Sequence, residues 1–225
     1  TSSLGMYTGF TLQNQSVGTA GASTLSLGTG HSVSLGTLEA DGKALVNAIN
    51  ATGISGLSAT VNATSVASVA TTAGTGITAG NSVVTVNNVA INIATTTDAT
   101  TNRANALSAI NAQSSVTGVV ATDDGQGLKL TAADGRNITT ELTTPATGAT
   151  MASFGLAAGA TTSATYNVSY SGKALGTDNA FSMSGVGAGA TATVGSTGTA
   201  ISAIDISDVE GATTALNAID AALQG

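Results

Sequence analysis

Short stretches in which apolar and polar residues alternate recur along the chain, and this period-two pattern predicts β-strands. The clearest example is the pair 82–86 and 89–93, which flanks Asn87 and Asn88. Because asparagine accepts positive φ angles, two of them between such stretches predict a tight hairpin. Further strands are expected at 116–122 and 128–132, which flank a longer loop at 123–127, and at 138–142, 166–170 and 190–194.

Apolar residues at helical spacing are confined to a few segments. Residues 42–51 carry an apolar stripe that includes Leu45 and Ile49, which predicts a short amphipathic helix. Residues 101–112 carry a similar stripe that includes Ile110, and residues 151–156 are long enough for one helical turn.

The two helical segments belong to an internal repeat. Residues 47–51 (Asn-Ala-Ile-Asn-Ala) match 108–112 (Ser-Ala-Ile-Asn-Ala), and 56–60 (Gly-Leu-Ser-Ala-Thr) match 118–122 (Gly-Val-Val-Ala-Thr). The second linker is one residue longer, and the strands expected before the helices are 32–35 and 89–93. Each copy therefore reads as strand, loop, short helix, glycine turn and strand.

These patterns predict an α+β, β-rich fold. It consists of two related small α/β modules with antiparallel sheets, followed by a β return and a C-terminal helix. The expected segments are a β entry at 1–28, the first module at 29–78, the second module at 79–160, the β return at 161–200 and the start of the C-terminal helix at 201–225.

Composition narrows the function classes. The 225 residues include 8% charged and 3% aromatic residues, with five Lys and Arg in total and a net charge of −7, which excludes the basic surface that nucleic acids require. There is no Cys and one His, so disulfides, thiolate metal sites and His-rich metal sites are not expected. Neither a membrane-spanning apolar run nor a signal peptide is expected. An acidic, Cys-free chain rich in Thr, Ser, Ala and Gly is typical of an exported bacterial surface protein.

The C-terminal segment has a pattern of its own. Ser207 and Glu210 form a capping box for a helix, and Asp208 lies in its first turn. The apolar residues that follow alternate at spacings of three and four, which is a coiled-coil seam rather than the face of a globular helix. The seam residues are Val209, Ala212, Leu216, Ile219 and Leu223.

Residues 204–223, with Ile-Asp-Ile-Ser, then Val-Glu-Gly-Ala, then Ala-Leu-Asn-Ala-Ile-Asp-Ala-Ala-Leu, resemble the start of the C-terminal rod helix of bacterial flagellins. Residues 89–138 resemble the repeat found in the variable regions of flagellins and in hook-associated and filament-cap proteins, and residues 151–156 fit the usual tail of that repeat. By this resemblance, 1–28 enters from the rod domain, 201–225 begins the rod helix, and the five seam residues pack in the filament.

The resemblance implies a structural subunit of the flagellar filament, with this chain as its surface-exposed variable region. It implies a role in motility and as a surface antigen, and an extracellular location. The implied partners are other flagellin subunits, and host receptors or antibodies, with no nucleic acid or membrane. The long N-terminal rod helices of the family are absent, so the chain resembles a truncated fragment, and we expect it to be monomeric.

Two other function classes stay open. One is an adhesin-like or polysaccharide-binding surface module, with a hook-associated or filament-cap protein as a close neighbour of the main hypothesis. The other is an enzyme, for which His31 is the candidate base. The sudden heptad pattern at the C-terminus favours the filament subunit, because an adhesin module needs no such seam.

Candidate chemical groups are few, and each has a structural interpretation that we favour. His31 precedes a strand, and no Gly-x-Ser-x-Gly motif surrounds a serine. Asp123-Asp124-Gly125 and Asp134-Gly135 lack the spacing of a calcium loop and are expected to be turns. The glycine-rich segment 185–189 lacks the Gly-Lys-Ser/Thr of a phosphate loop. We therefore expect no catalytic, cofactor-binding or metal-binding residue.

Overall fold

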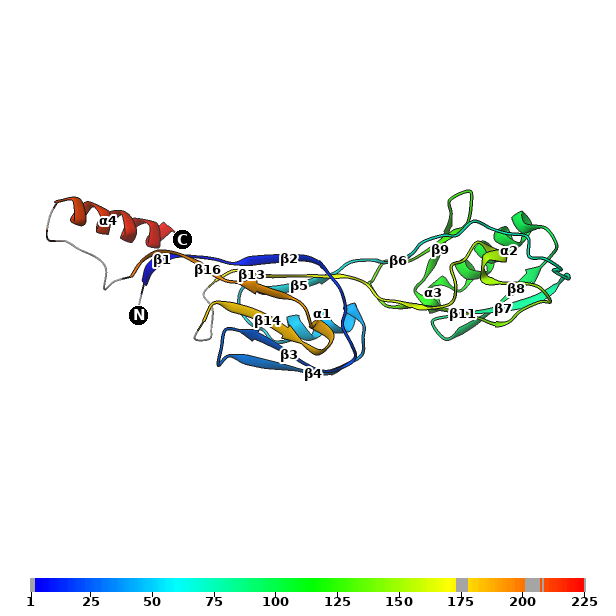
Figure 1. Ribbon diagram of the computed structural model, residues 1–225, viewed down its shortest axis with the longest axis horizontal. Helices are drawn as coiled ribbons and strands as arrows, with labels where there is room; N and C mark the ends of the chain where they lie inside the picture. Colours follow the sequence, from blue (N-terminus) through cyan, green and yellow to red (C-terminus); the bar gives the residue numbers. More distant parts are fainter. Residues whose placement is uncertain (1–2, 173–177, 201–206, 208, 225) are drawn as a thin grey trace. The chain divides into compact units, whose positions relative to one another are not determined.

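A computed structural model describes residues 3–172, 178–200, 207 and 209–224 of the chain. The described residues form a mixed α+β fold with several antiparallel sheets and a C-terminal helix (Figure 1). The fold class expected from the sequence is therefore confirmed.

Within the described residues, the chain separates into two compact units. Unit 1 comprises 1–39, 45–60 and 167–225, and unit 2 comprises 40–44 and 61–166. This division differs from the consecutive segments 29–78 and 79–160 drawn from the sequence, because the strands that complete unit 1 come after residue 166. The segment expected as a β return supplies those strands.

Unit 1 is built around two sheets and includes most of helix α1 (Gly42–Ala51). A four-stranded sheet has the order β15-β14-β3-β4, and a three-stranded sheet has the order β2-β13-β5. The bounds are β2 (Phe10–Gln15), β3 (Gly21–Leu27), β4 (Ser32–Leu38), β5 (Leu57–Val61), β13 (Tyr166–Tyr170), β14 (Ala180–Ser184), η2 (Gly185–Gly187) and β15 (Thr191–Thr193).

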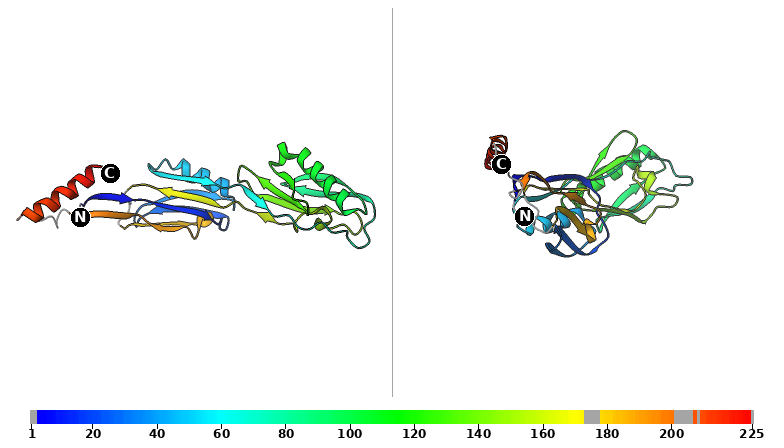
Figure 2. Two further views of the ribbon diagram at one scale, coloured as in Figure 1. Left: turned by 90° about the horizontal axis from the view of Figure 1, so that it is seen from above. Right: turned by 60° about the vertical axis from the view of Figure 1, so that its left-hand side comes forward.

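Three further elements of unit 1 lie toward the two ends of the chain. β1 (Ser3–Thr8) pairs with β16 (Gly195–Ala200) as an antiparallel ladder, in register from Ser3 opposite Ala200 to Thr8 opposite Gly195. Helix α4 (Val209–Gln224) contacts both strands and lies beside β1 in each view (Figures 1 and 2). The C-terminal helix expected from the sequence is thus present.

Unit 2 also contains a four-stranded and a three-stranded sheet, in the orders β12-β11-β7-β8 and β6-β10-β9. Helix α2 packs against β8 and β9. The bounds are β6 (Thr64–Val66), β7 (Gly80–Val86), β8 (Val89–Thr95), α2 (Ala99–Ala112), α3 (Ser114–Thr117), β9 (Val120–Asp123), β10 (Leu128–Ala132), β11 (Ile138–Thr144), η1 (Met151–Phe154) and β12 (Thr161–Thr162).

Each unit has a core of aliphatic side chains together with a few aromatic rings. In unit 1 the fully buried residues include Leu25, Leu45 and Ile49, and the rings of Phe10 and Phe181 lie 4.4 Å apart. In unit 2 they include Ile93, Ile110, Leu128 and Phe154. Alanines such as Ala106 and Ala121 also lie in the core, so each large aliphatic residue supplies a large share of the buried apolar area.

The local predictions are largely confirmed. Asn87 and Asn88 have φ angles of 46° and 65° and join β7 to β8, as the hairpin pattern indicated. One strand prediction is wrong at its start, because residues 114–117 form the short helix α3 and not part of a strand. Gly118, with φ of 70°, ends that helix in the left-handed conformation, and β9 begins two residues later.

Candidate functional site

The seam predicted at the C-terminus lies on helix α4. Its large residues are exposed, by 85% at Val209, 66% at Leu216 and 39% at Ile219. Among the positions of α4 whose side chains are described, Ala215 is buried and Ala212 is half-buried. Residues 201–206, Asp208 of the capping box and the side chain of Leu223 lie outside the described part of the chain.

This exposure sets α4 apart from α1 and α2. In those two helices Leu45, Ile49 and Ile110 are all at 0% exposure. On α4 the small residue Ala215 is buried and the large residues Val209 and Leu216 face solvent, which reverses the usual arrangement of an amphipathic helix. Val209, Leu216 and Ile219 therefore form an exposed apolar stripe that the described part of the chain leaves largely uncovered.

The acidic loop 123–127 is held together by its own carboxylates. Asp124 accepts hydrogen bonds from the Ser68 hydroxyl and from the backbone N–H groups of Gln126 (3.0 Å) and Gly127 (2.8 Å). These hydrogen bonds, with the one from Ser68 the largest contribution, lower the pKa of Asp124 to about 2. Asp123 pairs with Arg103, whose Nε lies 2.9 Å from its Oδ2. The loop is therefore a folded turn, as expected.

The second acidic turn is an ion cluster. The carboxylate of Asp134 lies 2.7 Å from Lys43 Nζ and 2.8 Å from Arg136 Nη2. The hydrogen bonds from Arg136, followed by that from Lys43, hold the pKa of Asp134 well below its usual value. Nearby, Asp41 accepts from the N–H groups of Ala44 (2.9 Å) and Asn137 (3.1 Å). These carboxylates bind chain segments together and leave little capacity for a ligand.

The remaining sequence candidates occupy turns. His31 is half-buried and closes the turn between β3 and β4, where its backbone N–H donates to the carbonyl of Gly28 at 3.1 Å. The glycine-rich segment forms η2 and the turn after it, and the Ser23 hydroxyl accepts the N–H of Val186 at 3.0 Å. Burial raises the pKa of Tyr166 to about 12, which keeps its hydroxyl protonated. Among the described residues, no group of His, Cys, Asp and Glu could hold a metal ion.

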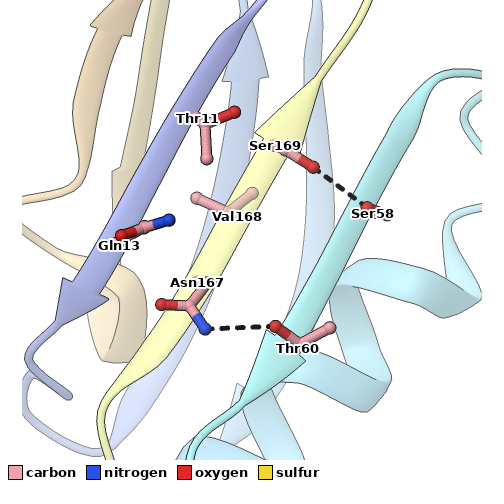
Figure 3. A pocket seen from close by; sticks show the side chains of 7 residues that line it. All are labelled: Thr11, Gln13, Ser58, Thr60, Asn167, Val168 and Ser169. Carbon is pink, nitrogen blue, oxygen red and sulfur yellow. Dashed lines mark hydrogen bonds between the residues drawn. The ribbon is translucent and has the colours of Figure 1, made fainter.

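A shallow hollow of about 230 Å³ lies on the three-stranded sheet of unit 1 (Figure 3). Its polar side chains hydrogen-bond across the strands: Ser58 with Ser169 at 3.0 Å, and Asn167 Nδ2 to Thr60 at 3.2 Å. No charged or aromatic side chain lines it, so it offers neither an acid–base pair nor a stacking platform for a sugar ring. Its lining residues are Thr11, Gln13, Ser58, Thr60, Asn167, Val168 and Ser169.

A wider and more apolar hollow of about 420 Å³ lies on unit 2 beside η1. Val69, Met151 and Leu156 supply its apolar surface, and no ionisable side chain lines it. Sequence reasoning missed both hollows. The alternation of polar residues along 11–13, 58–60 and 167–169 signals a polar sheet face, but this signal becomes readable only when the pairing of these distant strands is known.

The comparisons with known proteins identify no relative. No protein-family model matches the chain, and no curated protein matches it significantly. Within the part of the chain that the structure describes, no helix is long and apolar enough to cross a membrane. Among the surfaces described above, the exposed stripe on α4 is the feature that points most directly to a partner.

Proposed function

We propose that this chain is the surface-exposed variable region of a structural subunit of the bacterial flagellar filament, together with the start of its rod helix. The observation that carries the proposal is the exposed stripe of Val209, Leu216 and Ile219 on α4. Large apolar residues at coiled-coil spacing are stable in water when a second helix covers them. In a filament, the rod helices of the same and neighbouring subunits supply that cover.

The rest of the described chain fits a structural role. The hydrogen-bond capacity of Asp124 and Asp134 is taken up by the local fold, and the polar hollow of unit 1 carries no reactive group. Two β-rich units with few charges and many exposed Ser and Thr residues provide a solvent-facing surface. On this proposal the units face outward and the apolar stripe faces the shaft.

Immunogold electron microscopy of the source bacterium tests the proposal. Antibodies raised against unit 2, which contains the exposed loop residues 123–126, should label extracellular filaments along their whole length. Label confined to the hook or to the filament tip would assign the chain to a hook-associated or cap protein. Label spread over the cell wall, with filaments unmarked, would overturn the proposal in favour of an adhesin-like module.

A pair of matched variants tests the role of the stripe. In the full-length protein, Leu216→Glu should abolish filament assembly because it places a charge in the helical seam. The control is Val116→Glu in unit 2, which alters an apolar residue of similar exposure (62%, against 66% for Leu216) and should leave assembly intact. Normal filaments with Leu216→Glu would contradict the proposed packing of α4.

A further inference from the structure

The two units share one order of elements. Unit 2 runs β6, β7, β8, α2, β9, β10, β11 and β12, while unit 1 runs β2, β3, β4, α1, β5, β13, β14 and β15. The sheets agree as well: β12-β11-β7-β8 corresponds to β15-β14-β3-β4, and β6-β10-β9 corresponds to β2-β13-β5. Unit 2 adds the short helix α3 after α2. The same connectivity through two sheets indicates one fold used twice.

The same side-chain contact joins helix to strand in each unit. In unit 2, Asn111 Oδ1 accepts the N–H of Ala121 at 2.8 Å, and Asn111 Nδ2 donates to the carbonyl of Ala121 at 3.0 Å. In unit 1, Asn50 makes the same two bonds to Ala59, both at 2.9 Å. These are the matched residues of the sequence repeat. We call each pair of hydrogen bonds an asparagine clamp.

The starts of the helices and the return segments also correspond. Asp98 accepts the N–H of Thr101 at the start of α2, and Asp41 accepts the N–H of Ala44 at the start of α1. The return segments 155–161 (Gly-Leu-Ala-Ala-Gly-Ala-Thr) and 185–191 (Gly-Val-Gly-Ala-Gly-Ala-Thr) begin with glycines at φ of 72° and 67°. Each ends in the edge strand, β12 or β15.

The asparagine clamps fix the residue equivalence at the next hairpin. In unit 2 the N–H of Asp124 donates to the carbonyl of Gly127 at 3.1 Å and closes the β9–β10 hairpin. At the equivalent place between β5 and β13, the N–H of Asn62 donates to the carbonyl of Thr165 at 2.9 Å. Residues 63–164 therefore stand where unit 2 has Gly125 and Gln126.

We propose that the hairpin loop after the clamped strand is an acceptor site for a whole folded module. In unit 1 this site is occupied by residues 63–164, and in unit 2 the loop Asp124–Gly127 is the same site closed by a turn. The inference rests on the topology and these contacts, and it stands independently of the filament role.

The local geometry suits an insertion. The hydrogen bond between Asp124 and Gly127 holds the two ends of the hairpin loop together. A module whose own first and last residues are adjacent can therefore be inserted without separating β9 from β10. Asp124, Gly125 and Gln126 are exposed, and a Cβ on Gly125 would meet no atom within 4 Å. The entropy of closing a loop grows slowly with its length, so a long insert disturbs the hairpin little more than a short one.

The test inserts a second copy of residues 63–164 in place of Gly125 of the full chain and keeps Gln126, whose carbonyl accepts the N–H of Thr71 at 2.7 Å. A second variant carries an unrelated stable domain with adjacent ends at the same place. The matched controls place both inserts between Asn87 and Asn88, in a turn of positive φ where Asn87 also accepts the N–H of Thr139 at 2.8 Å. Amide NMR spectra and thermal unfolding report on the host unit.

We expect both acceptor-site variants to keep the amide shifts of Ile110 and Ala121 and to unfold within a few degrees of the parent. Both controls should lose these shifts and unfold at a clearly lower temperature. Loss of the host fold with both inserts at the acceptor site would overturn the proposal. Equal tolerance at the Asn87–Asn88 turn would overturn it too, because the loop would then be no special site.

Discussion

Units 1 and 2 keep the same contacts at their centre and differ at their edges. The asparagine clamp and the helix-capping aspartate are common to both, whereas α1 has 10 residues and α2 has 14. The longer helix in unit 2 is anchored by Asn102, a fully buried residue whose Oδ1 accepts the N–H of Thr96 at 2.6 Å. Helix length can thus change when a new polar anchor satisfies the added turn, while the clamp stays in place.

The core at the helix also differs in size. Leu45 of α1 occupies the position that Ala106 occupies in α2, and both are at 0% exposure. Unit 2 has the smaller residue there, and other aliphatic residues of its core, such as Ile93 and Leu128, are fully buried. The comparison teaches that the asparagine clamp and the matched isoleucine are common to both helices, while the neighbouring apolar position differs in size.

The largest expected effect comes from the matched isoleucines. Ile110→Ala and Ile49→Ala should each lower the free energy of unfolding of their own unit by about 2–5 kcal/mol, because both side chains are fully buried. Chemical denaturation followed by amide signals of each unit measures this. Val116→Ala, at a residue 62% exposed, is the control and should change stability by about 0.5 kcal/mol or less. A small effect at either isoleucine would break the equivalence of the two helices.

The asparagine clamps should give the next largest effect. Asn111→Ala and Asn50→Ala each leave one N–H and one carbonyl of a buried alanine without a partner, which costs about 1–3 kcal/mol for each group. Asn105→Ala removes a single exposed hydrogen bond, to the carbonyl of Ala94, and should cost about 1 kcal/mol at most. Equal destabilisation by Asn105→Ala and Asn111→Ala would show that the clamp has no special role.

Acid should destabilise unit 2 more than unit 1. Hydrogen bonds lower the pKa values of three carboxyl groups in unit 2, those of Asp98, Asp124 and Asp134, and that of Asp124 falls to about 2. In the described part of unit 1, hydrogen bonds lower the pKa of Asp178. A carboxyl whose native pKa lies below its unfolded value of about 4 stabilises the fold above pH 4 and loses that contribution as the pH falls through the native pKa.

We therefore expect the unfolding temperature of unit 2 to fall more than that of unit 1 between pH 5 and pH 2. Thermal unfolding monitored by amide signals at each pH measures the two values separately. Asp124→Asn should weaken the pH dependence of unit 2 and leave that of unit 1 unchanged. A greater acid sensitivity of unit 1 would reverse the comparison.

The smallest expected effect is at the exposed stripe of α4. Leu216→Glu should change the stability of either unit by about 0.5 kcal/mol or less, because the side chain is 66% exposed. The contrast with its expected effect on filament assembly is the informative result. Sedimentation of the chain at micromolar concentration should show a monomer with or without the substitution. Strong destabilisation of unit 1 would mean that Leu216 packs within the chain.

Local pattern in the sequence predicted the elements whose determinants are close together. The asparagine turn at 87–88 and the helix at 42–51 follow from neighbouring residues, and both are confirmed. The repeat of Asn50 and Asn111 was visible as well, but its physical meaning was not. That meaning depends on side chains reaching residues nine and ten positions away, Ala59 and Ala121.

The position of residues 63–164 between β5 and β13 of unit 1 could not be predicted in this way. The closing pair of Asn62 and Thr165 is separated by 103 positions, and no periodicity signals a contact at that distance. The stripe on α4 was readable from its spacing, whereas its exposure depends on Ala215, and not Leu216, being the buried residue. Sequence pattern gives spacing, and the packing of distant segments decides which face is covered.

The most direct test of one fold used twice is an NMR measurement of scalar couplings across hydrogen bonds in the full chain. We expect couplings from Ala59 N to the side-chain carbonyl carbon of Asn50 and from Ala121 N to that of Asn111. We also expect backbone couplings from Asn62 N to the carbonyl carbon of Thr165 and from Asp124 N to that of Gly127. Detection of all four would establish the equivalence and the place of the insertion. A coupling from Asn62 or Ala59 to any other carbonyl would contradict it.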